Sequence, residues 1–528
     1  MNAFDAPANT EKTHLRGSLL FALGRLVALF INFLMQVITV RYLSKPDFGA
    51  FAFCLSVGGV LAVVSVFGTD KAVSRFLAVY IDQRQYGKFW GTLRIMLSTV
   101  VLIGSMFGAV FSIAWYTGYS PQGHDEQMRF LLVVAALFAF LNALDALFLA
   151  LFPVIAKPSL VFYRRYLLTP VFKLSAALVV ILCGGGVVAF ALGQLVASFL
   201  GLSICLWFFR KVVQSNDALR ESRREKVTVP KRRLYGFSGT VLLGDIAFLF
   251  RSAIVPVVLG VWFGDPEVAS FQAVVPLARV NEFVLVAFSV LFLPRAAKLA
   301  ASADAGSLHS LYDSTVAWIV LLTFPVFAIT VIGADYLPGL LFGSKYDSSN
   351  TVLVWLACGY FVHATFGLST RLLRVAGEVR TLLWADLLIS LMAFCFVFGL
   401  SVQLGAVGGA IAVFTAFVIQ ASVHQLCVIK TLKIQTLRWH TVSPFIVAFG
   451  LAFFGLILVR TMQFGIFWII VISVVCSLLM FLLFGRHLNL GEVLPELRRF
   501  PFIYSLLCGS SDEIPSQEKP QDQTETKS

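Results

Sequence analysis

The chain has 528 residues, of which 59% are hydrophobic and 13% are charged, and its formal net charge is +13. Soluble proteins carry about 25% charged residues, because charge keeps their surface in contact with water. The composition therefore excludes a soluble globular protein of this length and indicates that lipid surrounds most of the chain.

Apolar segments with the length of a bilayer-spanning helix, about 20 residues, follow one another along most of the chain. They lack the short polar–apolar alternation of strands in a membrane β-barrel. We predict an all-α integral membrane protein with about fourteen transmembrane helices, because a helix satisfies its own backbone groups in lipid. The predicted helices are 18–40, 48–67, 92–116, 130–152, 162–183, 186–209, 237–262, 270–293, 314–335, 350–368, 381–400, 405–428, 442–460 and 465–485.

The basic residues between these helices predict how the chain is oriented. If the N-terminus is cytoplasmic, the inner loops hold most lysines and arginines, and the run from 210 to 233 is the densest. The outer loops hold only Arg41, Lys45, Arg129, Lys345 and Arg460. This bias predicts a multi-pass protein of the cytoplasmic (inner) membrane with both termini cytoplasmic. The partner of the positive charge is then the membrane lipid, and no nucleic acid is expected.

The basic stretch after the sixth predicted helix divides the chain into two lobes. In chain order we predict a cytoplasmic N-terminus (1–16), an N-lobe with helices one to six (17–209), a basic cytoplasmic linker (210–236), a C-lobe with helices seven to twelve (237–428), two extra helices (429–485), and a cytoplasmic, partly disordered tail (486–528). The disorder prediction rests on the Ser, Gln, Glu and Pro content of the tail.

The two lobes show signs of an internal repeat. At an offset of 220 residues, Gly24 aligns with Gly244 and Pro46 aligns with Pro266. A polar stripe on one face of helix one also aligns with a polar stripe on helix seven. The stripes are Ser18, Arg25, Asn32 and Gln36, and Ser238, Asp245, Ser252 and Pro256. Because both copies start on the same side, we predict two pseudo-symmetric six-helix lobes related by an axis along the membrane normal.

Polar and ionisable side chains inside the predicted helices are candidate substrate-binding groups, because charge within a span faces a cavity or a partner. The candidate cavity residues are Arg25, Arg279, Asn32, Gln36, Asp245, Arg251 and Glu282. For Arg25 we favour a cavity position, and the alternative is a structural ion pair with Asp145 or Asp245. Arg279 and Glu282 are three residues apart, so the alternative for them is an ion pair with each other.

Motifs of catalysis are missing from the sequence. There is no Walker A element, no H-E-x-x-H, no G-x-S-x-G and no G-x-G-x-x-G after a strand. The eight cysteines form no C-x-x-C pair, so we predict no metal site and no cofactor. His363 and His424 could relay protons, although a lone helical histidine is more often a packing residue. We predict a transporter rather than an enzyme, and leave open whether an H⁺ or a Na⁺ gradient drives it.

The segments "VRYLSKPDFGAFAF" (40–53), "LLFGSKYDSSNTVLVWL" (340–356) and "FLPRAAKLAA" (292–301) resemble elements of a known family. The family is the lipid-linked polysaccharide flippases, the Wzx-type translocases of O-antigen and exopolysaccharide. The segment 40–53 is similar to their R-x-L-x-x-x-[DE]-[FY]-G-x-[FY] element after helix one, and the segment 340–356 to their F-G-x-x-Y element before helix ten. The segment 292–301 is similar to the proline-containing end of their helix eight. The resemblance runs over residues 15–485 and places the chain near the multidrug/oligosaccharidyl-lipid/polysaccharide (MOP) exporter superfamily.

The resemblance implies alternating access without ATP and the flipping of undecaprenyl-diphosphate-linked oligosaccharide units for polysaccharide biosynthesis. In the related lipid II flippases, arginines of helices one and eight hold the diphosphate, and Arg25 and Arg279 look like their counterparts. The substrate would be a lipid-linked glycan, and polysaccharide polymerase or chain-length machinery is a candidate protein partner. The alternatives are a lipid II flippase, a MATE-like ion-coupled exporter and, from a different class, a membrane glycan polymerase or ligase.

Overall fold

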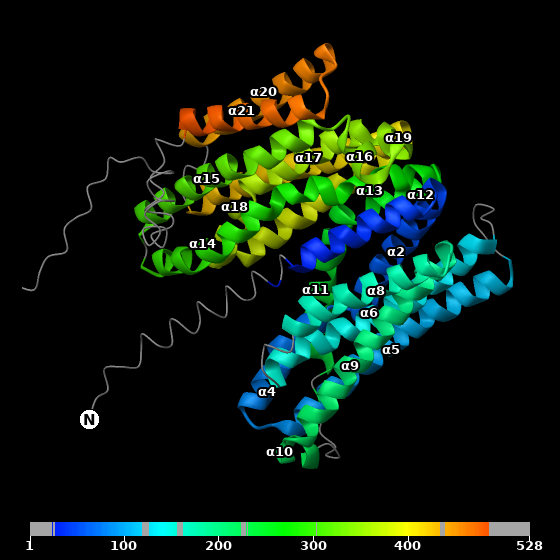
Figure 1. Ribbon diagram of the computed structural model, residues 1–528. Helices are drawn as coiled ribbons and strands as arrows, with labels where there is room; N and C mark the ends of the chain where they lie inside the picture. The colour runs from blue at the N-terminus through cyan, green and yellow to red at the C-terminus, as the bar shows by residue number, and fades with distance from the viewer. Residues whose placement is uncertain are drawn as a thin grey trace, which may run out of the picture.

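The computed structural model describes residues 24, 27–118, 126–155, 162–222, 229, 231–302, 304–432 and 439–484. Within these ranges the chain is helical almost throughout and contains no strand (Figure 1). The prediction of an all-α protein is therefore confirmed. Arg25 lies outside the described residues, as do the predicted N-terminus (1–16) and tail (486–528).

The first bundle of helices is formed by residues of the predicted N-lobe. It contains, in order, helix Val27–Tyr42, α2 (Lys45–Val66), α3 (Thr69–Ala72), the π-helical turn η1 (Val73–Leu77), α4 (Ala78–Asp82), α5 (Tyr86–Tyr116), α6 (Glu126–Ile155), a second π-helical turn η2 (Tyr163–Leu168), α8 (Thr169–Leu182) and α9 (Val187–Gln214). The short α10 (Asp217–Glu221) follows at the start of the predicted linker.

The second bundle begins after the linker and includes the last described helices. Its elements are α11 (Lys231–Ser252), α12 (Ile254–Trp262), α13 (Asp265–Arg279), η4 (Val280–Glu282), α14 (Phe283–Ala301), α15 (Ala305–Ile332), α16 (Leu337–Phe342), η5 (Ser344–Ser349), α17 (Asn350–Phe366), α18 (Leu368–Val375), α19 (Val379–Leu432), α20 (Trp439–Met462) and α21 (Ile466–Phe484). Helices α20 and α21 lie along α15, on the side of this bundle that faces away from the N-lobe (Figure 1).

Eleven described helices are long and apolar enough to cross a membrane, and α11 and α12, bent by 58° where they join, are long and apolar enough when taken together. Helix α19 covers two predicted spans. Its backbone leaves the helical conformation at Gly405, where φ is 58°, and this break separates the two spans. Helix Val27–Tyr42 is the described part of the first predicted span. Each predicted span therefore overlaps a helix, and the prediction of a multi-pass membrane protein is confirmed.

The two lobes join at one end and separate toward the other. One hydrophobic core runs through both lobes and includes Phe51 and Leu131 of the N-lobe together with Leu259 and Phe271 of the C-lobe. A second core, around Trp90, is built from the N-lobe and α11. In Figure 1 the bundles meet where α2 lies beside α12 and α13, and they diverge toward α10 and α14. We call these two ends the α16 end and the α10 end.

Glycine residues allow the close approach of the lobes at the α16 end. A Cβ atom on Gly49 of α2 would lie 1.8 Å from the backbone oxygen of Asp265, at the start of α13. A Cβ atom on Gly260 of α12 would lie 2.3 Å from the ring of Phe53. Any larger residue at these two positions would force the helices apart, so the sequence itself fixes α2 against the C-lobe.

Candidate functional site

Two of the three segments that carry the family resemblance, 40–53 and 340–356, contact each other at the α16 end. Arg41 donates hydrogen bonds from Nε to the Leu341 oxygen at 2.7 Å and from Nη2 to the Leu340 oxygen at 2.5 Å. In return, Lys345 donates from Nζ to the backbone oxygens of Arg41, at 3.3 Å, and of Leu43. Each segment thus supplies a cation that binds carbonyl groups of the other.

An aromatic ring fills the centre of this contact. The Tyr346 side chain is fully buried, and the Phe48 ring meets it edge-on with 6.4 Å between centroids. Lys45 and Lys345 lie over the same ring, with Nζ at 5.7 Å and 5.6 Å from its centroid. Such contacts between cations and an aromatic face are attractive. We call the contact between residues 41–49 and 340–348 the interlobe latch.

A polar seam continues from the latch into the interior. Gln36 donates from Nε2 to the backbone oxygen of Gln272 at 3.4 Å, and Gln272 donates from its own Nε2 to the Ser56 hydroxyl at 3.3 Å. These residues come from helix Val27–Tyr42, α2 and α13, so the seam joins both lobes. Gln36, one of the predicted site residues, therefore lies at the boundary between the lobes.

Arg279 extends the polar face of α13 beyond this seam. It follows Gln272 by seven residues, which is two helical turns, so the two side chains share one face of the helix. Gln272 contacts the N-lobe, whereas the Arg279 side chain is 55% exposed. On the opposite lobe, Asn32 precedes Gln36 by one turn and is also exposed; it donates to the Ala28 oxygen at 2.7 Å. Arg279 and Asn32 thus lie on the two helices that the Gln36–Gln272 hydrogen bond joins.

A break in the span positions Arg279. Helix α13 ends at Arg279, the 3₁₀ turn Val280–Glu282 follows, and α14 then continues in the membrane. The turn is fixed by Asn281, which is fully buried and donates from Nδ2 to the Ala278 oxygen at 2.9 Å and to the Thr330 hydroxyl at 3.4 Å. The cation therefore stands at a fixed point within the Asp265–Val290 span.

The Arg279 guanidinium and the neighbouring Glu282 carboxylate lie close to the side chains of Tyr360 and His363. Arg279 Nε lies 3.9 Å from Glu282 Oε2, and the guanidinium lies 5.8 Å from the Tyr360 ring centroid. His363 Nε2 lies 3.7 Å from the other oxygen of Glu282, and the imidazole stacks on Phe417 at 4.7 Å. The 3.9 Å from Arg279 Nε to Glu282 exceeds an ordinary hydrogen-bond length, and a guanidinium has five N–H donors, so Arg279 has donors that can bind an anion.

Asp245, another predicted cavity residue, is held in an ion pair at the α10 end. Lys71 of α3 donates to Asp245 Oδ2 at 2.6 Å and also lies 3.9 Å from Asp70. Burial raises the pKa of Asp70, and the adjacent Lys71 opposes that rise. The Asp245–Lys71 pair joins α11, the first element of the C-lobe, to the N-lobe.

Aromatic contacts reinforce the attachment of α11. The Phe237 ring meets the ring of Phe76 at 5.8 Å and the guanidinium of Arg75 at 4.5 Å. The Tyr235 hydroxyl lies 3.0 Å from the hydroxyl of Thr99. Beyond the 58° bend, α12 joins the core that is shared with α13 and α2. The α11–α12 span therefore contacts the N-lobe at both ends of the molecule.

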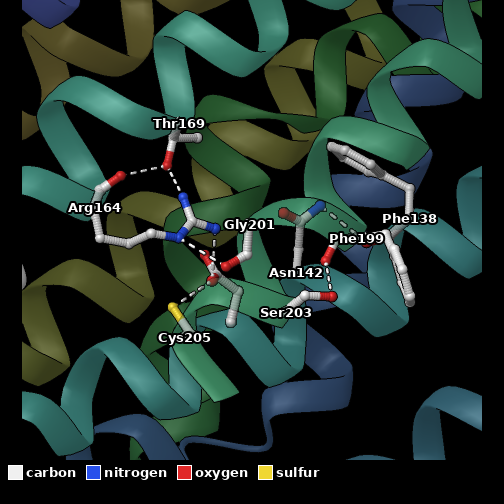
Figure 2. Close-up of polar contacts among 9 residues, drawn as sticks. Phe138, Asn142, Arg164, Thr169, Phe199, Gly201, Ser203 and Cys205 are labelled. Atoms are coloured by element: carbon white, nitrogen blue, oxygen red, sulfur yellow. Dashed lines mark hydrogen bonds and ion pairs between the residues drawn. The ribbon is translucent and has the colours of Figure 1, made fainter. Parts of the chain in front are cut away.

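A buried ion pair lies inside the N-lobe (Figure 2). Arg164 is 4% exposed, and its Nη2 lies 2.8 Å from Asp145 Oδ1. Its Nε donates to the Gly201 oxygen at 3.1 Å, its Nη1 donates to the Thr169 hydroxyl, and the Cys205 thiol reaches Asp145 at 3.4 Å. Figure 2 shows the guanidinium directed between Thr169 and Gly201. The network is closed within one lobe, so we assign it to the architecture rather than to the substrate.

The structure thus brings together some of the predicted site residues and separates others. Arg279 and Glu282 approach each other, Gln36 contacts α13 across the lobe boundary, Asn32 lies one turn before Gln36, and Asp245 is at the α10 end. Arg25 and the side chain of Arg251 lie outside the described residues. Both acids that the sequence offered as partners of Arg25 have other partners, Arg164 for Asp145 and Lys71 for Asp245. Arg279 and Glu282 do approach each other, as the alternative reading proposed.

Sequence reasoning missed Arg164, Tyr360 and Gln272. Arg164 lies within the predicted span 162–183, but the sequence did not show that the π-helical turn η2 holds it in a buried position. The spacing of Gln272 and Arg279, seven residues apart on one helix, is a signal that the sequence did contain. Among the described residues, no group of three His, Cys, Asp or Glu side chains could hold a metal ion.

Comparison with known proteins identifies the family. A family model described as "Polysaccharide biosynthesis protein" matches residues 38–351, which is more than half of the chain. The chain belongs to this family. The probable low-salt glycan biosynthesis flippase Agl15 of Haloferax volcanii is 21% identical over 224 residues, 41% of this chain and 47% of that protein. The chain thus spans about half the length of this curated relative.

Solved structures share the fold. A lipid II flippase, MurJ, in an inward closed conformation matches with a TM-score of 0.63 at 14% identity, covering 91% of this chain and 100% of that one. An inward-facing multidrug resistance MATE family transporter of the MOP superfamily also has a TM-score of 0.63, at 15% identity, covering 78% and 99%. The solved structures confirm the predicted fold class, and the family match and the flippase relative confirm the resemblance to glycan flippases of polysaccharide biosynthesis.

Proposed function

We propose that this protein translocates a lipid-linked glycan across the cytoplasmic membrane during polysaccharide biosynthesis, and that the lipid is undecaprenyl diphosphate. Family membership and the flippase relative support glycan translocation. The diphosphate is the part of such a substrate that lipid excludes most strongly, because an unpaired charge in hydrocarbon is costly. A translocator must therefore offer cations within the span.

The observation that favours this substrate is the position of Arg279. A guanidinium binds phosphate oxygens through paired hydrogen bonds, and Arg279 is half exposed at a fixed break in the span. It shares a helix face with Gln272, which contacts the other lobe, so an anion bound there would lie between the lobes. Arg25, which precedes Gln36 by eleven residues on the same polar stripe of the first predicted helix, is the proposed second cation.

Translocation would proceed by alternating access. In the described state the interlobe latch closes the α16 end, and the lobes diverge toward the α10 end. We assign the α10 end, with its basic linker, to the cytoplasm and the latch to the outer face. Release of the glycan outside would then require the latch to open while the α10 end closes. Coupling to an ion gradient would bias this cycle, and no ATP-binding motif is present.

The proposal is tested by leaflet-specific detection of a fluorescent undecaprenyl-diphospho-oligosaccharide in vesicles that contain the purified protein. We expect glycan to become accessible in the opposite leaflet, with Arg279→Ala at least about tenfold slower and Arg279→Lys intermediate, because lysine keeps the charge but loses the planar fork. Arg220→Ala, on the exposed pair with Asp217 in α10, is the matched control and should leave the rate unchanged.

Product analysis in the same assay separates the alternatives. Lengthened glycan chains would identify a polymerase or ligase instead, and transport of lipid II in preference to oligosaccharide units would identify a lipid II flippase. Efflux of a soluble cationic drug with no movement of lipid-linked glycan would indicate a MATE-like exporter. Equal glycan transport by the wild type and Arg279→Ala would exclude the proposed role of this arginine.

A further inference from the structure

We propose that the interlobe latch is an anion site. As the latch opens, Arg41, Lys45 and Lys345 exchange neutral oxygens of the protein for the phosphate oxygens of a lipid headgroup at the outer face. The inference rests on the proposed function, because it takes the α16 end as the outer face and as the side of release. It adds to Arg279 a second place at which the headgroup is held.

The cations of the latch are held by neutral oxygens. Arg41 donates to two carbonyl oxygens of the C-lobe, and Lys345 donates to two carbonyl oxygens of the N-lobe. Lys45 donates to the Ser348 hydroxyl at 3.3 Å. Carbonyl and hydroxyl oxygens replace the water around a cation, but only an anion balances its charge. The closed latch therefore satisfies these donors without neutralising them.

The two carboxylates of the latch are directed elsewhere. Asp47 accepts a hydrogen bond from the Ser44 hydroxyl at 2.5 Å, within the cap of α2. Asp347 lies against Gly339, where a Cβ atom would be 2.1 Å from its Oδ1. Within the described ranges neither acid forms an ion pair with a cation of the latch. The cations meet there without a counter-ion in contact.

Two buried hydroxyl groups at the latch also lack a partner. Tyr346 and Ser349 are fully buried, and their hydroxyls form no hydrogen bond with any residue that the structure describes. The Tyr346 ring is the one over which Lys45 and Lys345 lie. A buried hydroxyl without a partner destabilises the state that buries it. The closed latch thus gathers more donors than acceptors, which is the complement of an anion.

The latch also lies where an outgoing headgroup would pass. Only five basic residues occupy the predicted outer loops, and three of them meet here, although positive charge on that side opposes the topology. A fourth, Arg460, is paired with Asp335 at 2.8 Å. The polar seam of Gln36 and Gln272 leads along the lobe boundary from Arg279 toward the latch.

A phosphate-bearing headgroup fits these donors, because guanidinium and ammonium groups both bind phosphate oxygens. Arg41 is exposed and the two lysines are half-buried, so an anion can reach them from outside. The headgroup of a lipid-linked glycan and that of an anionic phospholipid share this chemistry. Because the cations must leave the opposite lobe to bind it, anion binding favours the open latch.

Distances between two spin labels across the latch test this coupling. One label is placed on native Cys183, exposed at the α16 end of the N-lobe, and the other on a cysteine at Thr461, exposed at that end of the C-lobe, with the other cysteines replaced. The full-length protein is studied in nanodiscs of zwitterionic lipid. We expect a short-chain prenyl-diphospho-sugar to increase the population with the longer distance.

Phosphatidylglycerol added to the nanodisc distinguishes the two sources of phosphate. Opening by this lipid alone would identify the phospholipid headgroup as a ligand of the latch. Opening by the diphospho-sugar alone would identify the transported headgroup. Opening by neither would overturn the inference.

Lys45→Gln separates anion binding from closure of the latch. In the closed state it removes a 3.3 Å hydrogen bond to a neutral hydroxyl and a contact with the Tyr346 ring. We expect the probe concentration for half-maximal opening to rise by about fivefold, as suits a partly exposed ion contact, and to stay near the wild-type value in Lys45→Arg. A fall in Lys45→Gln would show that Lys45 only closes the latch. Arg129→Gln removes an outer-loop cation beside Gly118 and is the matched control.

Tyr346→Phe tests the unpaired hydroxyl without a change of charge. Phenylalanine keeps the ring and removes the buried hydroxyl, so the open population without probe should fall, whereas a rise would contradict the claim that this hydroxyl is unpaired. Glycan transport is measured on the same preparations. A protein that moves no glycan would refute the proposed function, whereas a transporting protein whose latch responds to neither headgroup would refute this inference alone.

Discussion

At Gly201, a single hydrogen atom in place of a side chain preserves the buried ion pair of the N-lobe. A Cβ atom there would lie 2.1 Å from Arg164 Nη2, so Gly201→Ala should displace the guanidinium from Asp145. Leaving a buried charge without its partner costs about 3–5 kcal/mol. We expect a marked fall in the Tm of the detergent-solubilised protein. Gly108→Ala, where nothing lies within 4 Å of the added atom, is the control.

The companion test replaces the pair. Asp145→Leu with Arg164→Leu should be more stable than either single substitution, because it removes both buried charges together. If the double variant were less stable than Asp145→Leu alone, Arg164 would have a role beyond pairing. Unchanged stability of Gly201→Ala would show that the guanidinium has room to move.

Asp335 provides a pH-dependent contact between α20 and the turn before α16. It accepts hydrogen bonds from Arg460 at 2.8 Å and 2.9 Å and from Asn350 at 2.7 Å. The Arg460 hydrogen bonds hold the pKa of Asp335 below its usual value. A lowered folded-state pKa contributes stability above the unfolded value, near 3.9, which is lost as the pH falls through the folded value.

We therefore expect Asp335→Asn to lower stability at neutral pH by less than about 1 kcal/mol, since both partners are partly exposed. The difference in Tm between variant and wild type should shrink as the pH falls below about 4. Thermal unfolding across this pH series is the measurement. A constant difference at every pH would mean that the amide substitution acts through packing rather than charge.

At the scale of elements, α11 is the C-lobe helix that depends on the N-lobe for its position. Asp245→Ala should release it from Lys71, so that a cysteine placed at Ser238, which is fully buried, becomes reactive to thiol reagents. In a background without the native cysteines, we expect labelling to accelerate several-fold, on the order of a lost 1 kcal/mol contact. The charge-swapped pair Lys71→Asp with Asp245→Lys should restore protection, and Asp217→Ala should have no effect.

The elements also show what the sequence could predict. The length of the apolar segments and the charge of the loops predicted the spans. Each span must hydrogen-bond its own backbone groups in lipid, so its local composition is apolar and can be recognised in the sequence. The partner of an intramembrane charge is a property of neighbouring helices, so Asp145 and Asp245 could not be matched to Arg164 and Lys71 in advance. Arg164 lies near the start of a predicted span, and the sequence did not show that the π-helical turn there buries its side chain.

For the whole molecule, the interlobe latch predicts that the lobes must separate at the α16 end during transport. A cleavable thiol cross-linker between cysteines at Lys45 and Ser348, whose side chains lie 3.3 Å apart, should stop glycan transport, and reduction should restore it. The same cross-link between Asp335 and Asn350, within the C-lobe, is the control and should leave transport intact. Continued transport with the latch cross-linked would exclude opening at this end.

The lengths of the helices connect this protein to the thickness of its membrane. Helix α5 has 31 residues and would extend about 46 Å, whereas the hydrocarbon core is about 30 Å thick. Such a helix tilts or deforms the bilayer around it. If the lobes pivot about the α16 end, the tilt of each changes, and with it the thickness of lipid that each state fits best. Acyl-chain length would then act as an allosteric effector, and a cell that remodels its lipids would retune glycan export without altering this protein.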